Sequence, residues 1–130
     1  MIVDSSALVA VLRREAGFER LVDAMLDAEA ILVPASCYLE VAMVIAGRKG
    51  PDSRPEIDLL LDRLQARVAP FGEAQARAAA DAFLRFGKGR HPAGLNFGDC
   101  MAYAVAQAEG APLLFTGEDF AKTDVARWEA

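Results

Sequence analysis

The sequence predicts an α/β protein built on an open, parallel β-sheet with helices on both faces. Short apolar runs alternate with longer stretches of helical character, which is the pattern of repeated strand–helix–strand units. The length of 130 residues suits one domain with a single core, so we expect one domain over residues 1–130. Apolar residues make up 54% of the chain and charged residues 25%, which excludes a disordered protein.

Four apolar runs are the strand candidates, and a sheet of four or five short strands is expected. The first ends in Asp4, the second is bounded by Pro34, and the last follows Gly110. In order, the predicted strands are residues 1–4, 30–33, 67–71 and 112–115.

The helices are predicted from end signals and from apolar periodicity. The hydroxyls of Ser5 and Ser6 can cap the first helix, and Pro55 suits the first turn of the fourth. Gly47 and Gly110 mark two helix ends. In order, the predicted helices are residues 7–14, 17–29, 35–47, 55–64, 73–86 and 98–109. The segments 48–54 and 87–97 are rich in Gly and charge and are expected to be loops.

Charge and hydropathy exclude several classes of protein. Fourteen basic and nineteen acidic residues leave a net charge of −5, so no general basic field attracts a polyanion. Arg85, Lys88 and Arg90 could contact phosphates, although a solvated charged face is the commoner meaning of such residues. The apolar runs are far shorter than the roughly 20 residues that span a bilayer, so no membrane is expected. Without a secretory signal the expected location is the cytoplasm.

Three acids interrupt apolar segments where parallel strands end or helices begin. Asp4 follows the first strand, Glu40 lies one turn into the third helix, and Asp99 lies in the first turn of the last helix. Each acid alone has a plain structural explanation, as a helix cap, a partner of the helix dipole or a half-buried side chain that reaches solvent. Because ligands of such sheets bind at the carboxyl ends of the strands, we expect the three to meet in one site.

Converging carboxylates repel one another unless a cation neutralises them. Oxygen ligands alone suit Mg²⁺ or Mn²⁺. Cys37 and Cys100 are expected to be buried thiols, and His91 is the only histidine, so a zinc site is not expected. An acidic Mg²⁺ site suits hydrolysis of a phosphodiester.

Two other phosphoryl-transfer folds share this layout but lack support. A receiver domain needs an acid pair after the first strand and an acceptor Asp after the third, where Phe71 and Gly72 stand. A haloacid-type phosphatase needs a second Asp two residues after the first, and Ser6 occupies that position.

Four segments together resemble one known family over the whole chain. They are Met1-Ile2-Val3-Asp4-Ser5-Ser6-Ala7, residues 36–40, Leu95-Asn96-Phe97-Gly98-Asp99-Cys100 with Ala102-Tyr103-Ala104, and residues 113–120. Their order and separation are similar to those of PIN-domain ribonucleases, specifically the VapC-type toxins of bacterial toxin–antitoxin pairs.

The resemblance implies a fold, an activity and partners. It implies a PIN-like three-layer sandwich and cleavage of RNA that depends on Mg²⁺ or Mn²⁺ and inhibits translation. It also implies a VapB-like antitoxin and a homodimer. By their match, Asp4 and Asp99 resemble direct metal ligands, and Glu40 resembles a further ligand or a residue that orients water. Asn96 and Ser6 resemble residues that support the site on the substrate side.

The fourth acid of the family pattern is less clear in this sequence. Gly117 occupies the place of an acid that many members carry, which leaves Asp119 and Glu118 as candidates. Asp119 is the better match and is taken as a catalytic residue, although either acid could serve only in a turn. An alternative function is a catalytically weak PIN-like module that acts mainly by binding an antitoxin or an operator complex.

Overall fold

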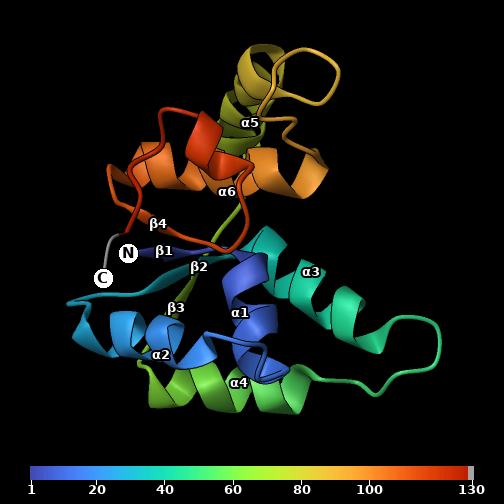
Figure 1. Cartoon of the computed structure of the whole chain (residues 1–130), viewed down its shortest axis with the longest axis vertical. Coiled ribbons are helices and arrows are strands. Elements are labelled where there is room, and N and C mark those ends of the chain that lie inside the picture. The colour runs from blue at the N-terminus through green and yellow to red at the C-terminus, as the bar shows by residue number, and fades with distance from the viewer. Residues whose placement is uncertain (129–130) are drawn as a thin grey trace.

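A computed structural model describes residues 1–128 as four parallel strands with helices on both sides of the sheet (Figure 1). The strands are β1 (Ile2–Val3), β2 (Leu32–Pro34), β3 (Arg67–Ala69) and β4 (Leu113–Leu114), and their order in the sheet is β3-β2-β1-β4. Ile2 of the central strand β1 pairs with Leu32 on one side and with Leu113 on the other. The predicted fold class and parallel sheet are therefore confirmed.

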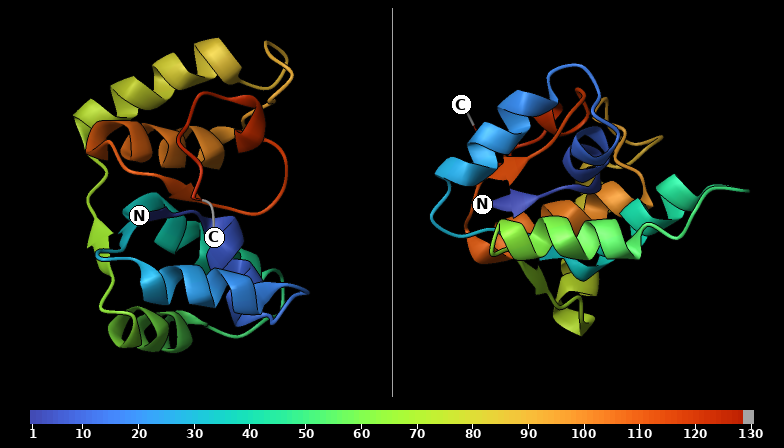
Figure 2. Two further views of the ribbon diagram at one scale, coloured as in Figure 1. Left: turned by 60° about the vertical axis from the view of Figure 1, so that its left-hand side comes forward. Right: turned by 90° about the horizontal axis from the view of Figure 1, so that it is seen from below.

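The helices form two layers, one on each side of the sheet. They are α1 (Ser5–Leu12), α2 (Phe18–Asp27), α3 (Ala35–Ala46), α4 (Arg54–Arg63), α5 (Glu73–Phe86) and α6 (Phe97–Glu109). The pair α5 and α6 covers one face of the sheet, while α1, α2 and α4 lie toward the other (Figures 1 and 2). Helix α3 packs against α1 and also contacts α6, so it joins the two layers.

The start of α1 differs from the prediction. The N-cap is Asp4, whose side chain accepts a hydrogen bond from the backbone N–H of Ser6, and Ser5 and Ser6 belong to the helix itself. A carboxylate caps a helix as well as a hydroxyl does, and it also interacts favourably with the positive end of the helix dipole. One residue therefore ends β1 and begins α1.

The core is centred on β1 and α6. Ile2, Val3 and Leu113 are fully buried in the sheet, and the small residues of α6 allow it to lie close above them. Cys37 and Cys100 are both buried free thiols, as predicted. Within residues 1–128, no helix combines the length and hydropathy that crossing a membrane requires.

The segment after β4 contains structure that the sequence patterns did not indicate. A short 3₁₀ helix, η1 (Phe120–Lys122), follows β4. The chain then returns to the edge of the sheet, where Leu113 donates its backbone N–H to the carbonyl of Ala126 and Trp128 donates to the carbonyl of Leu113. These bonds cover part of the open edge of β4.

Candidate active site

The carboxyl ends of β1 and β4 lie where the chain reverses its direction across the sheet. The connections from β1 to β3 move toward one edge, and the connection from β3 to β4 returns past β1 to the other edge. Such a reversal leaves a crevice at the carboxyl ends of the strands. Asp4 stands at this point, at the N-terminus of α1.

Asp4 is an acid held almost entirely out of water. It is 3% exposed, and its Oδ2 accepts bonds from the Ser6 backbone N–H (3.0 Å) and hydroxyl (2.6 Å). The Cys37 thiol lies 3.8 Å from Oδ1. Burial raises the pKa of Asp4 above its usual value, and Glu40 adds to that rise, while the bonds from Ser6 oppose it.

Glu40 reaches Asp4 from α3, which starts directly after β2. Its Oε1 accepts a hydrogen bond from the hydroxyl of Ser5, the neighbour of Asp4. The Glu40 carboxylate also lies against Gly98 of α6, because a Cβ at residue 98 would stand 2.5 Å from Oε2 and 2.9 Å from Oε1. Glycine at residue 98 therefore makes room for Glu40.

Asp99 lies at the N-terminus of α6, in a reciprocal capping arrangement with Asn96. The Asp99 backbone N–H donates to Asn96 Oδ1 (2.9 Å), and the Asn96 backbone N–H donates to Asp99 Oδ2 (3.1 Å). Desolvation raises the pKa of Asp99 to about 6, against the lowering effect of the bond from Asn96. The charges of Asp4, Asp119 and Glu40 contribute smaller parts of this rise in pKa.

Four acids from distant parts of the sequence thus share one electrostatic environment. Glu40 acts on the pKa of Asp4, and Asp4, Asp119 and Glu40 act on the pKa of Asp99. Asp119 is exposed and precedes η1. The fold therefore brings these four acids within electrostatic range of one another.

A scan against family models matches residues 1–126 to the PIN domain. The chain belongs to the PIN-domain family. Among its relatives is Ribonuclease VapC of Mycolicibacterium smegmatis, which is 47% identical over 97% of this chain and 98% of the relative. Ribonuclease VapC30 of Mycobacterium tuberculosis is 46% identical over 97% and 96% of the two chains. The resemblance to VapC-type PIN-domain ribonucleases is confirmed.

Solved PIN-domain structures share the fold at low sequence identity. The crystal structure of VapC20 from M. tuberculosis, described as a sarcin–ricin loop cleaving toxin, has a TM-score of 0.76 and 17% identity over 99% of this chain and 98% of that one. VapBC2 from Rickettsia felis, bound to a fragment of promoter DNA, has a TM-score of 0.72 and 12% identity over 98% of both chains.

The donor set of this PIN-domain site fits a hard divalent cation in chemistry, since every candidate ligand is a carboxylate. Among residues 1–128, however, no three His, Cys, Asp or Glu side chains are grouped closely enough to hold one ion as they stand. Glu40 is turned toward Ser5, and Asp99 toward the backbone of Asn96. A cation bound among these carboxylates would reduce the repulsion between their charges.

The two residues predicted to face the substrate have bonding roles of their own. The Ser6 hydroxyl donates to Asp4 and accepts from the Thr116 backbone N–H (3.1 Å), so it links the start of α1 to the loop after β4. The Asn96 side chain caps α6. Both residues lie beside the acids, and their contact with substrate remains a prediction.

Two serines near Glu40 were not singled out as site residues from the sequence. Ser5 binds the Glu40 carboxylate, and Ser36 lies one turn before Glu40 in α3. The Ser36 hydroxyl oxygen is buried and has no hydrogen-bond partner among the described residues. The i, i+4 spacing of Ser36 and Glu40 was a signal that could have found this residue.

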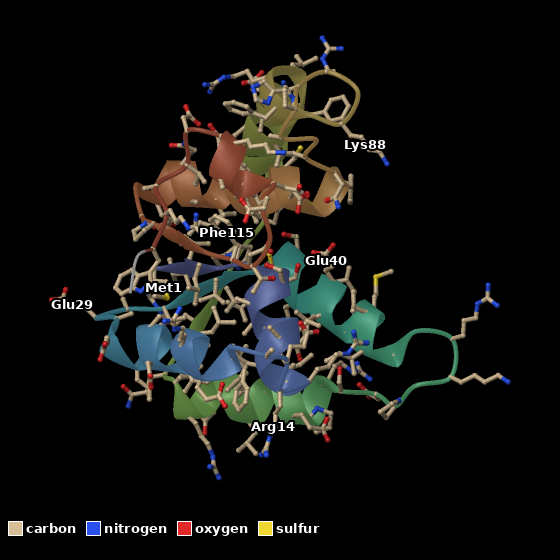
Figure 3. All side chains as sticks on the ribbon, in the orientation of Figure 1. Met1, Arg14, Glu29, Glu40, Lys88 and Phe115 are labelled. Carbon is tan, nitrogen blue, oxygen red and sulfur yellow. The ribbon has the colours of Figure 1, made fainter. Side chains whose placement is uncertain are left out.

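Apolar side chains line a cavity next to Glu40, whereas the basic residues Arg14 and Lys88 lie away from Glu40. A cavity of about 360 Å³ is lined by Ser36, Glu40 and Gly98 together with Leu39, Met43, Val44, Phe97 and Met101. Figure 3 shows Glu40 near the middle of the molecule, with Lys88 and Arg14 toward opposite ends. Neither of these two basic side chains balances the charge of the site.

The raised pKa of Asp99 predicts an unusual pH dependence of stability in the metal-free PIN domain. The folded state holds a proton on Asp99 up to about pH 6, while the unfolded chain releases it near pH 3.8. This contribution is present at low pH and is lost as the pH rises through 6. In EDTA, the free energy of unfolding of the wild type should fall by about 1 kcal/mol more between pH 5 and 7 than that of Asp99→Asn, allowing for solvent screening. Urea titrations of both proteins measure this difference, and parallel curves would contradict it.

The contact of Glu40 with Gly98 predicts a variant that folds but works poorly. In Gly98→Ala, the new methyl group should push the Glu40 carboxylate aside and lower nuclease activity about 10- to 100-fold. Stability should change little, because the new Cβ meets the far end of the flexible Glu40 side chain, which can move aside. Thermal unfolding and RNA cleavage assays separate the two effects. The substitution should add little in a Glu40→Ala background, and an additive loss would show that Glu40 is not the group displaced.

Proposed function

We propose that this PIN-domain protein is an endoribonuclease toxin that hydrolyses RNA with Mg²⁺ or Mn²⁺. The observation that supports the proposal most strongly is that the charge of Glu40 raises the pKa of Asp4, and the charges of Asp4, Asp119 and Glu40 raise the pKa of Asp99. Such an arrangement costs free energy in the empty protein, and a divalent cation would offset that cost. Relatives at 46–47% identity are named ribonucleases.

In this proposal each acid has a separate task. Asp4 and Asp99 hold the cation, and Glu40 serves as a further ligand or orients the attacking water. A bound Mg²⁺ or Mn²⁺ lowers the pKa of a water molecule and stabilises negative charge on a phosphoryl oxygen. Ser6 fixes the direction of the Asp4 carboxylate through its two hydrogen bonds. Asp119 lies closer to solvent and adds negative charge at the opening.

The partners follow from the same family relationship. Several structural neighbours come from complexes with antitoxins, including a toxin–antitoxin complex from Klebsiella pneumoniae with a TM-score of 0.70 over 99% of this chain and 98% of that one. We propose that a small VapB-like antitoxin neutralises this protein in the cytoplasm, where it would meet its RNA substrate.

A continuous apolar surface beside the site suits a homodimer. Two cavities share Phe97 and Met101, and the one between α5 and α6, about 510 Å³ in volume, has no charged residue in its lining. The exposed apolar side chains of this surface are Leu39, Met43, Val44, Phe83, Leu84 and Phe97. A second copy related by a two-fold axis would bury the same surface on both chains, with no charge left unpaired among these side chains.

The nuclease proposal is tested by titrating Mn²⁺ into antitoxin-free protein in a calorimeter and incubating the same samples with a mixed RNA pool. We expect the wild type to bind Mn²⁺ and to cut RNA, and EDTA to stop the cutting. Asp4→Ala and Asp99→Asn should fold and lose both properties, at least about 100-fold in rate. Asp119→Ala should cost less than Asp99→Ala.

Asp62→Asn is the matched control, because Asp62 is an exposed acid on α4 outside the site. It should behave as the wild type does. A wild type that binds no metal and cuts nothing would instead support the binding module, in which Gly117 marks the loss of a catalytic acid. Full activity in Asp99→Asn would refute the assigned site.

The dimer is tested by a charge placed in the middle of the apolar surface. Met43 is 63% exposed on α3, and Met43→Glu should weaken self-association at least about tenfold in sedimentation equilibrium. Leu59→Glu is the control, because Leu59 is 53% exposed on α4, outside this surface. Equal dimerisation by both variants would place the interface elsewhere.

A further inference from the structure

The loop from Thr116 to Asp124 carries Asp119 and is tied to the protein on both sides of that residue. Before Asp119, the Thr116 backbone N–H donates to the Ser6 hydroxyl at 3.1 Å. After it, Phe120 is buried against Phe115, with 5.2 Å between the ring centroids. These contacts attach the loop to the start of α1 and to the core beside β4.

Asp124 provides a further attachment, to α6 and α5. Its Oδ1 accepts a hydrogen bond from the Tyr103 hydroxyl, and its Oδ2 accepts one from Arg85 at 3.0 Å. The Gln107 side chain donates to the Tyr103 oxygen at 3.0 Å and to Asp124 Oδ1 at 3.4 Å. We call these four residues the Asp124 clamp. In Figure 1 the segment after β4, drawn in red, passes over α6.

Tyr103 is the buried and closely packed member of the Asp124 clamp. It is 4% exposed, and its ring packs against Phe86 with 5.6 Å between the centroids. The bond from Tyr103 is also the main reason that the pKa of Asp124 is lowered, so the folded protein favours a charged acceptor there. Hydrogen bonds to a charged acceptor are stronger than those between neutral groups. The ion pair with Arg85 is solvent-exposed and contributes less.

The same helix places Tyr103 and Asp99 one turn apart. Residues four apart in a helix lie on one face, so a group bound to Tyr103 is held at a fixed distance from the Asp99 position. Asp119 needs such external support, because its side chain makes no capping bond at the start of η1 and no hydrogen bond to another described residue. Its carboxylate is therefore positioned by the path of the loop.

We propose that Tyr103 and Asp124 are positioning residues that hold the loop so that Asp119 stands beside Asp99. The inference rests on the proposed function, in which Asp119 adds negative charge at the opening of the cation site and assists cleavage. Neither Tyr103 nor Asp124 touches the substrate. Losing the Tyr103 hydroxyl should loosen the loop and move the Asp119 carboxylate away from the cation, while Asp4, Glu40 and Asp99 keep their places.

The test compares Tyr103→Phe and Asp124→Asn with Tyr38→Phe in the full-length chain. Tyr38 is a matched control, because its hydroxyl donates to Asp58 at 2.6 Å, in another tyrosine–aspartate pair that joins α3 to α4. Three properties are measured: hydrogen–deuterium exchange of residues 116–124 without metal, the calorimetric affinity for Mn²⁺, and kcat and KM for RNA. The last two are repeated in an Asp119→Ala background.

We expect faster exchange confined to the loop in both clamp variants and unchanged exchange there in Tyr38→Phe. Mn²⁺ affinity and kcat should fall by up to about tenfold, within the range that a displacement of about 1 Å can cause. In the Asp119→Ala background, Tyr103→Phe should change neither quantity further. This lack of an added effect separates positioning of Asp119 from a general loss of stability.

The results that would overturn the inference differ from those that would overturn the nuclease proposal. Unchanged loop exchange in Tyr103→Phe, or an equal loss of Mn²⁺ affinity with and without Asp119, would refute the positioning role. A wild type that binds Mn²⁺ but cuts no RNA would refute the nuclease proposal, and the exchange and affinity measurements would still decide the role of the Asp124 clamp.

Discussion

The burial of the Asp4 carboxylate at the end of the central strand is the constraint on which the site and the junction of β1 with α1 depend. Taking a carboxylate out of water is costly unless its oxygens receive hydrogen bonds or a cation. The Ser6 backbone and hydroxyl meet part of that need, and they can do so because Asp4 is also the N-cap of α1. The end of β1 and the start of α1 are therefore tied to the position of one acid.

Glu40 and Asp99 add to the free-energy cost of burying the Asp4 carboxylate. Asp99 lies in the first turn of α6, where the helix dipole favours negative charge but does not cancel the repulsion from Asp4 and Glu40. Each of these two carboxylates accepts a hydrogen bond from a neighbouring residue. The Ser5 hydroxyl donates to Glu40, and the Asn96 backbone N–H donates to Asp99. A site with this arrangement is less stable when empty than a neutral crevice would be, which is the usual relation between stability and function at active sites.

Helix α6 connects the parts of the molecule that function requires. Gly98 leaves space for Glu40, Asp99 feels the charges of the other acids, and Tyr103 reaches the loop that carries Asp119. The small residues that follow let this helix lie close to the sheet, so its position is set by the core and not by the site. A rigid helix holds catalytic groups more precisely than a loop does, and here it also steadies the loop.

Local chemistry was enough to predict the positions of the four strands and six α-helices, and to single out the carboxylates at the carboxyl end of the sheet, but it did not indicate η1. The alternation of apolar runs and helical stretches identified the fold class, and Asp4, Glu40 and Asp99 stood out because each interrupts an apolar segment. The tertiary structure was needed for interactions between residues far apart in the chain. The space for Glu40 above Gly98, the hydroxyl of Ser6 shared with Thr116 and the bond between Tyr103 and Asp124 join segments that no local pattern relates. Apolar periodicity and capping patterns predict interactions between residues that are close in the sequence. The contacts named above depend instead on how the helices and loops pack around the sheet.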